Sequence, residues 1–356
     1  MPTETASGSA TFTKRTGHRI QILLLLVIIL LFFALLSLWT GSYRLSLPEI
    51  ISTLFAGNSD SLINHLIWNI RLPRTVAAIL AGSTLALSGS IMQTMLKNPL
   101  AAPSTLGVSQ GAAFGAAFAI IFLGAGQTFS SGNEAVIISS RATTAACAFG
   151  GGLLSVIGIL AISSYRDISS ESMVLAGVAM GAFLSACTMM LQYFASDVQV
   201  ASTLFWTFGD LGKAGWQENR LIAMLLLPAF CYLLAQGWSL NALQWGDDIA
   251  HSLGVSSGKL RVIGLLLTCL LVSVTTAFLG IIAFIGLMAP HIIRPFVGTD
   301  QRFLIPASSL CGAVLLLAAD CISRTILAPV VIPVGIITSF AGAPLFLYLL
   351  LRRRRL

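Results

Sequence analysis

Long stretches of the chain carry no charged side chain. Asp, Glu, Lys and Arg are absent from 20–43, 75–96, 98–133, 142–165, 172–196, 221–246, 262–293, 303–319 and 325–351. Each stretch can hold at least one helix of roughly 20 residues, the length that crosses a bilayer core. Backbone polar groups inside a bilayer must be paired within the protein, and these stretches lack the alternation of barrel strands. The pattern therefore predicts an all-α, polytopic membrane protein.

Ten membrane-spanning helices fit this pattern, although hydropathy alone also allows nine. We expect the spans near 20–39, 75–96, 103–124, 138–163, 172–194, 219–237, 261–280, 283–298, 304–323 and 334–351. The stretch 262–297 is too long for one helix and short for two, so Gly280–Gly286 must supply a tight turn or a break. With ten spans and a cytoplasmic N-terminus, most Lys and Arg residues fall on the cytoplasmic side, as the positive-inside rule requires.

The termini complete this organisation. Lys14, Arg15 and Arg19 precede an apolar stretch as in a signal peptide, but the stretch reaches Trp39 and no small-residue cleavage site follows. We therefore expect an uncleaved first span. The predicted parts are a cytoplasmic tail at 1–19, a transmembrane domain at 20–351 and a basic cytoplasmic C-terminus at 352–356.

Composition agrees with a membrane protein and offers no catalytic or metal site. Of the 356 residues 56% are hydrophobic and 9% charged, with a mean hydropathy of +0.91, whereas soluble domains carry roughly 25% charged residues. The net charge of +7 comes from cations at the ends of apolar stretches, so it indicates topology rather than nucleic-acid binding. The six cysteines and four histidines are scattered, so we expect no metal, no cofactor and no His-based catalytic set.

Small residues recur at four-residue spacing, the pattern that lets transmembrane helices pack closely. One set is Gly82, Ala86 and Ser90, and others are Gly107, Gly111 and Gly115, and Gly177, Gly181 and Ser185. A tightly packed bundle explains all three sets. The third set is alternatively the lining of a moving interface.

One polar stretch, at 239–260, interrupts the apolar pattern between the sixth and seventh spans. Ser239 or Asn241 can cap a short helix that Gly246 ends, and Asp247 or Asp248 favours the start of a second helix that Gly254 can close. Two short helices at the membrane surface suit docking of a cytoplasmic protein. An ordinary ordered loop is the alternative.

Cations also gather at the opposite side of the predicted bundle. Arg71 and Arg74 flank Pro73 at the start of the second span, where the helix dipole opposes positive charge. An acidic partner or lipid phosphate would neutralise them, and snorkelling arginines are the alternative. Asp320 and Arg324 are four residues apart in the ninth span, so an internal ion pair is the simple account, although Arg324 can also project outward.

Other function classes find less support. Gly254–Leu260 resembles a phosphate-binding loop but is one residue short of the motif and follows no strand, so this chain is not expected to bind ATP. An ion-coupled secondary carrier needs ionisable groups at mid-membrane, and only Asp320, with His291, fits that role. No nucleophile–base pair suggests an intramembrane enzyme.

From about residue 20 to 351 the chain resembles the FecCD-type permeases of iron-siderophore, haem and cobalamin ABC importers. The segments that carry the resemblance are Arg71-Leu-Pro-Arg-Thr, Gly89-Ser-Ile-Met-Gln, Asn98-Pro-Leu-Ala-Ala-Pro, Leu106-Gly-Val, Leu175-Ala-Gly-Val-Ala, Ser252-Leu-Gly-Val, Gly280-Ile-Ile-Ala-Phe-Ile-Gly-Leu-Met-Ala-Pro-His-Ile-Ile-Arg, Ala319-Asp-Cys-Ile-Ser-Arg, Pro333-Val-Gly-Ile-Ile-Thr and Gly342-Ala-Pro. The resemblance implies a type II ABC importer permease in the inner membrane, with ten helices and both termini cytoplasmic. It also implies a non-catalytic subunit that pairs with a second copy or a paralogue and works with two cytoplasmic ATPase subunits and a periplasmic or lipid-anchored substrate-binding protein.

The resemblance assigns roles to individual residues. It implies that Arg71, Arg74 and Arg324 meet acidic residues of the binding protein. The residues that it places in the helices contacting the ATPase are Asp247, Asp248, His251, Leu253 and Gly254. It places Gly177 and Gly181 on the helix that lines the path, and Ser169 and Ser170 at the cytoplasmic gate, where the neighbouring Glu171 departs from the family pattern. A ferric siderophore is the expected cargo, with haem or cobalamin as the alternative.

Overall fold

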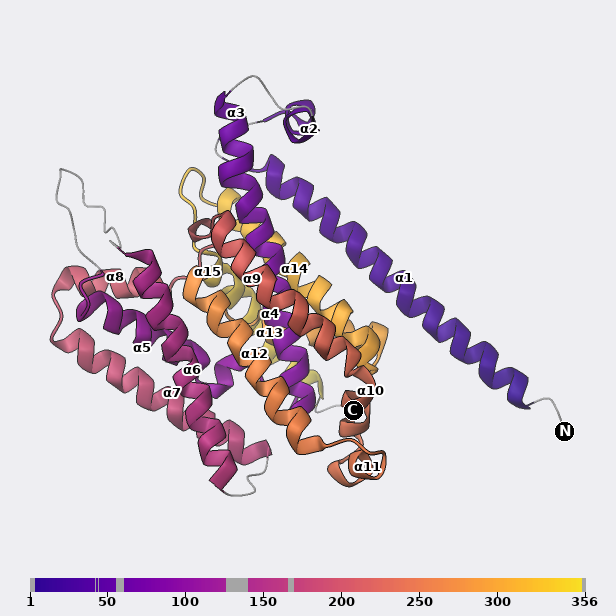
Figure 1. Ribbon diagram of the computed structural model, residues 1–356. Helices are drawn as coiled ribbons and strands as arrows, with labels where there is room; N and C mark the ends of the chain where they lie inside the picture. The colour runs from indigo at the N-terminus through magenta and orange to yellow at the C-terminus, as the bar shows by residue number, and fades with distance from the viewer. Residues whose placement is uncertain are drawn as a thin grey trace.

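The computed structural model describes residues 4–41, 43, 45–55, 61–125, 140–165 and 170–353, and the named elements in these ranges are all helices (Figure 1). They are α1 (Glu4–Trp39), α2 (Leu47–Phe55), α3 (Ser61–His65), η1 (Leu66–Arg71), α4 (Leu72–Met95), η2 (Pro103–Leu106), α5 (Val108–Ile121), α6 (Arg141–Tyr165), α7 (Ser170–Tyr193), α8 (Asp197–Thr207), η3 (Leu211–Lys213), α9 (Trp216–Ala235), α10 (Gly237–Gln244), α11 (Asp247–Ser252), α12 (Ser257–Leu279), α13 (Ile285–Val297), α14 (Gln301–Thr325) and α15 (Val334–Arg353). The predicted all-α fold is confirmed.

The ten predicted spans all correspond to apolar helices. Within the described residues, 7 helices are long and apolar enough to cross a membrane, in α1, α3–α4, α6, α7, α9, α12 and α14. The remaining three spans fall on the shorter apolar helices α5, α13 and α15. The sequence pattern did not predict α2, α3 or α8, because these helices are too short to give a hydropathy signal.

The break expected within Gly280–Gly286 separates α12 from α13. α12 ends at Leu279, and Gly280 follows with a φ of +79°, a left-handed conformation that glycine adopts without steric cost. The amide of Ile281 donates to the carbonyl of Thr207 (3.2 Å), so the end of α8 supports the extended segment. Two helices therefore fit into a stretch that is short for two.

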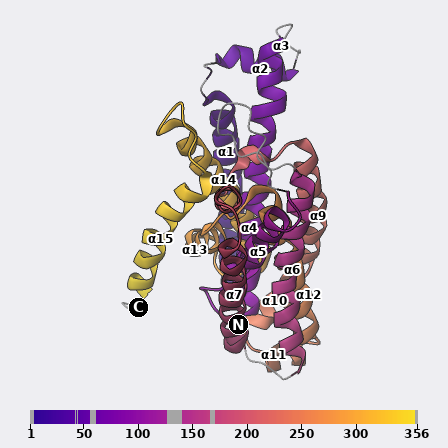
Figure 2. The same ribbon diagram turned by 90° about the vertical axis from the view of Figure 1, so that its left-hand side faces the viewer.

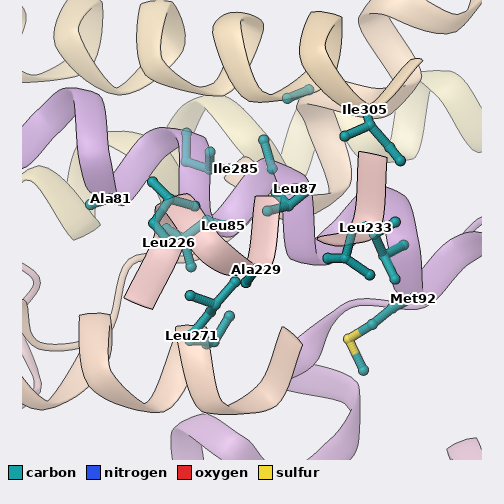
Figure 3. Close-up of a cluster of buried hydrophobic side chains, with 14 of the residues drawn as sticks. Ala81, Leu85, Leu87, Met92, Leu226, Ala229, Leu233, Leu271, Ile285 and Ile305 are labelled. Carbon is teal, nitrogen blue, oxygen red and sulfur yellow. The ribbon is translucent and has the colours of Figure 1, made fainter. Parts of the chain in front are cut away.

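The core of the bundle lies around α4. Figure 3 shows side chains of α4 meeting those of α9, α12, α13 and α14 in one apolar cluster. Gly82 of α4 and Gly312 of α14 face each other so closely that a Cβ on either would overlap the carbonyl oxygen of the other. The small-residue pattern thus explains how two backbones approach to this distance.

The bundle has two distinct ends. Figure 1 shows α2 and α3 at one end and α10 and α11 at the other, which we call the α2–α3 end and the α10–α11 end. The start of α1 and the end of α15 both lie at the α10–α11 end, as an even number of spans requires (Figures 1 and 2). Most of the tail predicted at 1–19 belongs to α1, because no proline interrupts the helix between Glu4 and Trp39.

Candidate functional site

The polar stretch at 239–260 forms the predicted pair of short helices. α10 begins at Gly237, before the caps proposed at Ser239 and Asn241, because only Gln236 separates it from α9. Gly246 (φ +127°) turns the chain into α11, and Gly254 (φ +79°) closes α11, as predicted. The side chain of Asn241 caps nothing in α10 and instead donates to Asp300 Oδ1 (2.8 Å).

Asp247 fastens α11 to the bundle. Its Oδ1 accepts from Lys97 Nζ (3.3 Å), which follows α4, and from Arg261 of α12 (3.1 Å). Although partial burial opposes ionisation, these two cations lower the pKa of the Asp247 carboxyl. Ala250 is fully buried below it. Asp247 therefore holds α11 in place. Its partners Lys97 and Arg261 were not predicted, because neither lies at a helical spacing from Asp247 that would pair them.

The rest of the α11 surface is exposed and largely apolar. Leu253 is 67% exposed, and Trp245, which sequence analysis did not single out, is 77% exposed. The α11 face, as we call this surface, consists of Trp245, Asp248, Ile249, His251 and Leu253. The sequence signal that could have indicated Trp245 is its position in a polar stretch, directly before Gly246, at which the chain turns. Exposed aromatic and aliphatic side chains rimmed by polar groups are typical of protein-binding surfaces.

At the α2–α3 end, Arg71 is buried. Its guanidinium donates to the carbonyls of Leu38 (2.6 Å) and Trp39 (3.2 Å) and to that of Tyr43. The last carbonyls of a helix have no partner within it, and a cation there also complements the helix dipole. Arg71 thus caps the C-terminal end of α1.

Arg74 and Arg324 meet at Asp320, which is fully buried. Arg74 Nε donates to Asp320 Oδ1 (2.8 Å), and Arg324 Nη2 lies 2.8 Å from Asp320 Oδ2, so the predicted pair within the ninth span is present. Arg324 also donates to the carbonyls of Ser37 (3.0 Å) and Thr40 (2.9 Å) in the same end of α1. The docking role of the three arginines stays a prediction, and a partner carboxylate would have to displace these internal acceptors.

A cavity of about 470 Å³ opens among α4, α5, α7, α12 and α13. Its lining consists of Leu85, Ala102, Pro103, Ser104, Ser109, Gln110, Ala113, Ser185, Thr188, Met189, Val272, Thr276, Ile281, Ile282, Ala283, Phe284, Gly286 and Leu287. None of these side chains is ionisable. The wall therefore offers hydroxyl, amide and apolar groups to whatever enters.

Gly177 and Gly181, which were predicted to lie on the helix that lines the path, are not part of the lining of this cavity. Gly177 packs so closely on η2 that a Cβ would overlap the carbonyl of Thr105, and Gly181 lies against Gly107. Both glycines therefore lie in helix packing within the chain, while Ser185, one turn further along α7, lines the cavity. Ser169 lies outside the described residues, and of Ser170 only its backbone position at the start of α7 is described. The path and gate roles stay predictions.

In the part of the chain that the structure describes, ten apolar helices, an uncharged cavity and an exposed helical pair are consistent with a membrane permease. The chain belongs to the FecCD transport family, whose model matches residues 27–352. The resemblance inferred from the sequence motifs is thereby confirmed. The chain is accordingly a multi-pass ABC importer permease.

Three relatives and one solved structure illustrate the similarity. The chain is 50% identical to a protein of Methanocaldococcus jannaschii described as an ABC transporter permease, over 89% of this chain and 90% of that protein. It is 37% identical to the hemin transport system permease HmuU of Yersinia pestis (94% and 98% covered) and 37% identical to the vitamin B12 import system permease BtuC of Salmonella paratyphi A (81% and 84% covered). A structure described as an inward-facing metal-chelate type ABC transporter matches with a TM-score of 0.81 and 29% identity, covering 93% of this chain and 99% of that one. Because the relatives are named for different cargoes, they do not single out a siderophore.

Proposed function

We propose that the chain carries a metal chelate across the inner membrane, driven by ATP hydrolysis on a separate subunit. The cavity supports this function because its lining contains no ionisable side chain. A metal ion wrapped in an organic ligand needs no charged ligands from the path, and this lining offers no side-chain charge that would pair with a bare cation or oxyanion. A ferric siderophore, haem and cobalamin are the candidate cargoes, and similarity to hemin and vitamin B12 permeases favours the last two as much as the first.

Two partners follow from the two ends of the bundle. The α11 face would contact a pair of cytoplasmic ATPase subunits, with both chain termini on the same side of the membrane as these subunits. The α2–α3 end would receive a periplasmic or lipid-anchored binding protein, and Arg71, Arg74 and Arg324 would reach it only after giving up their internal contacts. A second copy or a paralogue would complete the path.

Uptake in vesicles tests the proposal. The permease is reconstituted with its ATPase and binding protein, and uptake of haem, cobalamin and ferrichrome is followed with ATP inside or outside the vesicle. We expect uptake of one of these chelates to need ATP on the ATPase side and to survive an uncoupler. Uptake that an uncoupler stops while ATP remains would instead support a secondary carrier. The structure favours the first outcome, because the one carboxylate proposed for ion coupling, Asp320, is already paired with Arg74 and Arg324.

A further inference from the structure

The segment between α12 and α13 ends in a residue with an unusual backbone conformation. Phe284 has a φ of +66°, in the left-handed region that side chains other than glycine, asparagine and aspartate rarely adopt. Elsewhere in the same segment the chain uses glycine for this purpose, at Gly280. A phenylalanine at such a position costs stability relative to glycine, so its side chain needs an explanation.

The start of α13 enforces this conformation. The carbonyl of Phe284 accepts from the amides of Leu287 (3.0 Å) and Met288 (2.8 Å), and the amide of Ile285 donates to Ala283 (2.9 Å). These bonds involve only the backbone. Glycine would therefore form the same turn without strain, and the turn alone does not account for the phenylalanine.

The ring of Phe284 lies between α15 and the cavity. Gly342 of α15 lies so close that a Cβ there would overlap Phe284 Cβ and Cγ, so a glycine accommodates the ring. Phe284 is half-buried and also lines the uncharged cavity, together with Leu287 and Met189. The ring is thus held from behind by α15 and presents a surface to the cavity interior.

We propose that Phe284 contacts the cargo in transit. An aromatic ring in an uncharged wall favours the apolar or aromatic part of an organic chelate, whose ring atoms it can stack on or contact edge-on. This inference rests on the proposed transport function and narrows it to cargoes with such a surface. Ile281, Ile282 and Ala283 of the same break also line the cavity, and Phe284 adds the one aromatic ring of its lining.

The test compares Phe284→Gly, Phe284→Leu and Phe284→Tyr in the full complex with its ATPase and binding protein. The glycine variant removes the ring while relieving the backbone, so it is expected to assemble. Phe340→Ala is the matched control, since Phe340 lies on α15, is 78% exposed and is not part of the cavity lining. Uptake of haem, cobalamin and ferrichrome is measured beside cargo-independent ATPase activity and the melting temperature.

We expect at least a tenfold loss of uptake in Phe284→Gly, a smaller loss in Phe284→Leu, and near-normal uptake in Phe284→Tyr and Phe340→Ala, with the complex still assembled in every variant. Uptake by Phe284→Gly equal to the wild type would overturn the inference and leave the transport function standing. Equal loss of assembly in all three Phe284 variants would also overturn it, because the residue would then act only in packing. If the wild-type complex takes up none of the three chelates, the proposed function itself fails.

Discussion

Asp320 and Arg324 face each other across one turn of α14, with Oδ2 and Nη2 2.8 Å apart, and Arg74 of α4 approaches the other carboxylate oxygen to 2.8 Å. Asp320 has no exposed surface. One carboxylate therefore holds two guanidinium groups, and through Arg324 it connects α14 and α4 to the end of α1. A buried charge of this kind tolerates the loss of a partner poorly.

Replacing Asp320 with Asn should destabilise the protein strongly. The variant removes the counter-charge of Arg324 and, among the described residues, leaves Arg74 with only Asp210, at 3.6 Å. Removing one partner of a buried pair costs about 3–5 kcal/mol. The melting temperature of the purified permease in nanodiscs measures the effect. Asp248→Asn is the control, because Asp248 is exposed on α11 and should change stability by less than about 0.5 kcal/mol. An unchanged melting temperature in Asp320→Asn would show that the cluster contributes little to folding.

Charge reversal at Arg71 separates capping from docking. Arg71→Glu sets a carboxylate against the carbonyls of Leu38, Trp39 and Tyr43, so we expect a lower melting temperature even without any partner. If the arginine served only a binding protein, the melting temperature would stay the same and stimulation of the ATPase by that protein would disappear. Measuring both quantities on one preparation distinguishes the two roles.

Because α4 and α14 are in close contact, adding a single methyl group between them should lower the stability of the protein. Gly312→Ala places a Cβ on the backbone of Gly82, and overpacking of this kind costs typically about 1–3 kcal/mol. Gly150→Ala is the matched control, since Gly150 also lies inside a helix and a Cβ at that position would meet nothing within 4 Å. The control should be neutral or slightly stabilising, because alanine favours helix. Equal melting temperatures for the two variants would contradict the packing argument.

The α11 face predicts a partner-specific defect. Leu253→Ser combined with Trp245→Ser should release the ATPase subunits from the purified complex while leaving the melting temperature of the permease alone unchanged, since both side chains are exposed. Phe55→Ser is the control at the α2–α3 end, where Phe55 is 88% exposed. Full retention of the ATPase subunits by the double variant would refute this assignment of the docking surface.

Sequence alone predicted the elements that depend on local pattern. The ten apolar helices, the break near Gly280 and the turns at Gly246 and Gly254 follow from hydropathy and from the conformational range of glycine, which act over a few residues. Contacts between residues that lie far apart in the sequence could not be predicted in this way. The four-residue spacing gave the Asp320–Arg324 pair, but nothing in the sequence indicated that Arg74 reaches the same carboxylate from 246 residues away.

The contacts of the predicted site residues also involve distant segments, so the sequence did not indicate them. Arg71 was expected to face outward because a cation opposes the start of α4, yet the end of α1 provides the compensating carbonyls. Gly177 and Gly181 match a motif, but a motif does not say which neighbour a glycine faces. Phe284 lies in one of the segments that carry the family resemblance, but the sequence did not show its backbone angle or the cavity beside it.

Asp300 links α10 to the start of α14, and this link should respond to acid. Burial favours the neutral carboxyl, but hydrogen bonds from Arg302 (2.6 Å) and Asn241 (2.8 Å) outweigh it and lower the pKa of Asp300 to about 2. Since the folded-state pKa lies below the ordinary value near 3.9, the stabilisation is complete above about pH 4 and is lost as the pH falls toward 2. Allowing for partial exposure, we expect it to be worth roughly 1–2 kcal/mol.

Asp300→Asn isolates this contribution, because the amide cannot titrate. The wild type should be more stable than the variant by a constant amount from pH 5 to pH 8, and the difference should shrink below about pH 4. Denaturation of both proteins at a series of pH values measures it. Asp197→Asn, which changes a carboxylate at the start of α8, is the control for general acid effects. A difference between wild type and Asp300→Asn that grows on acidification would reverse the sign of the linkage and contradict the role of Arg302 and Asn241 as partners of the ionised carboxylate.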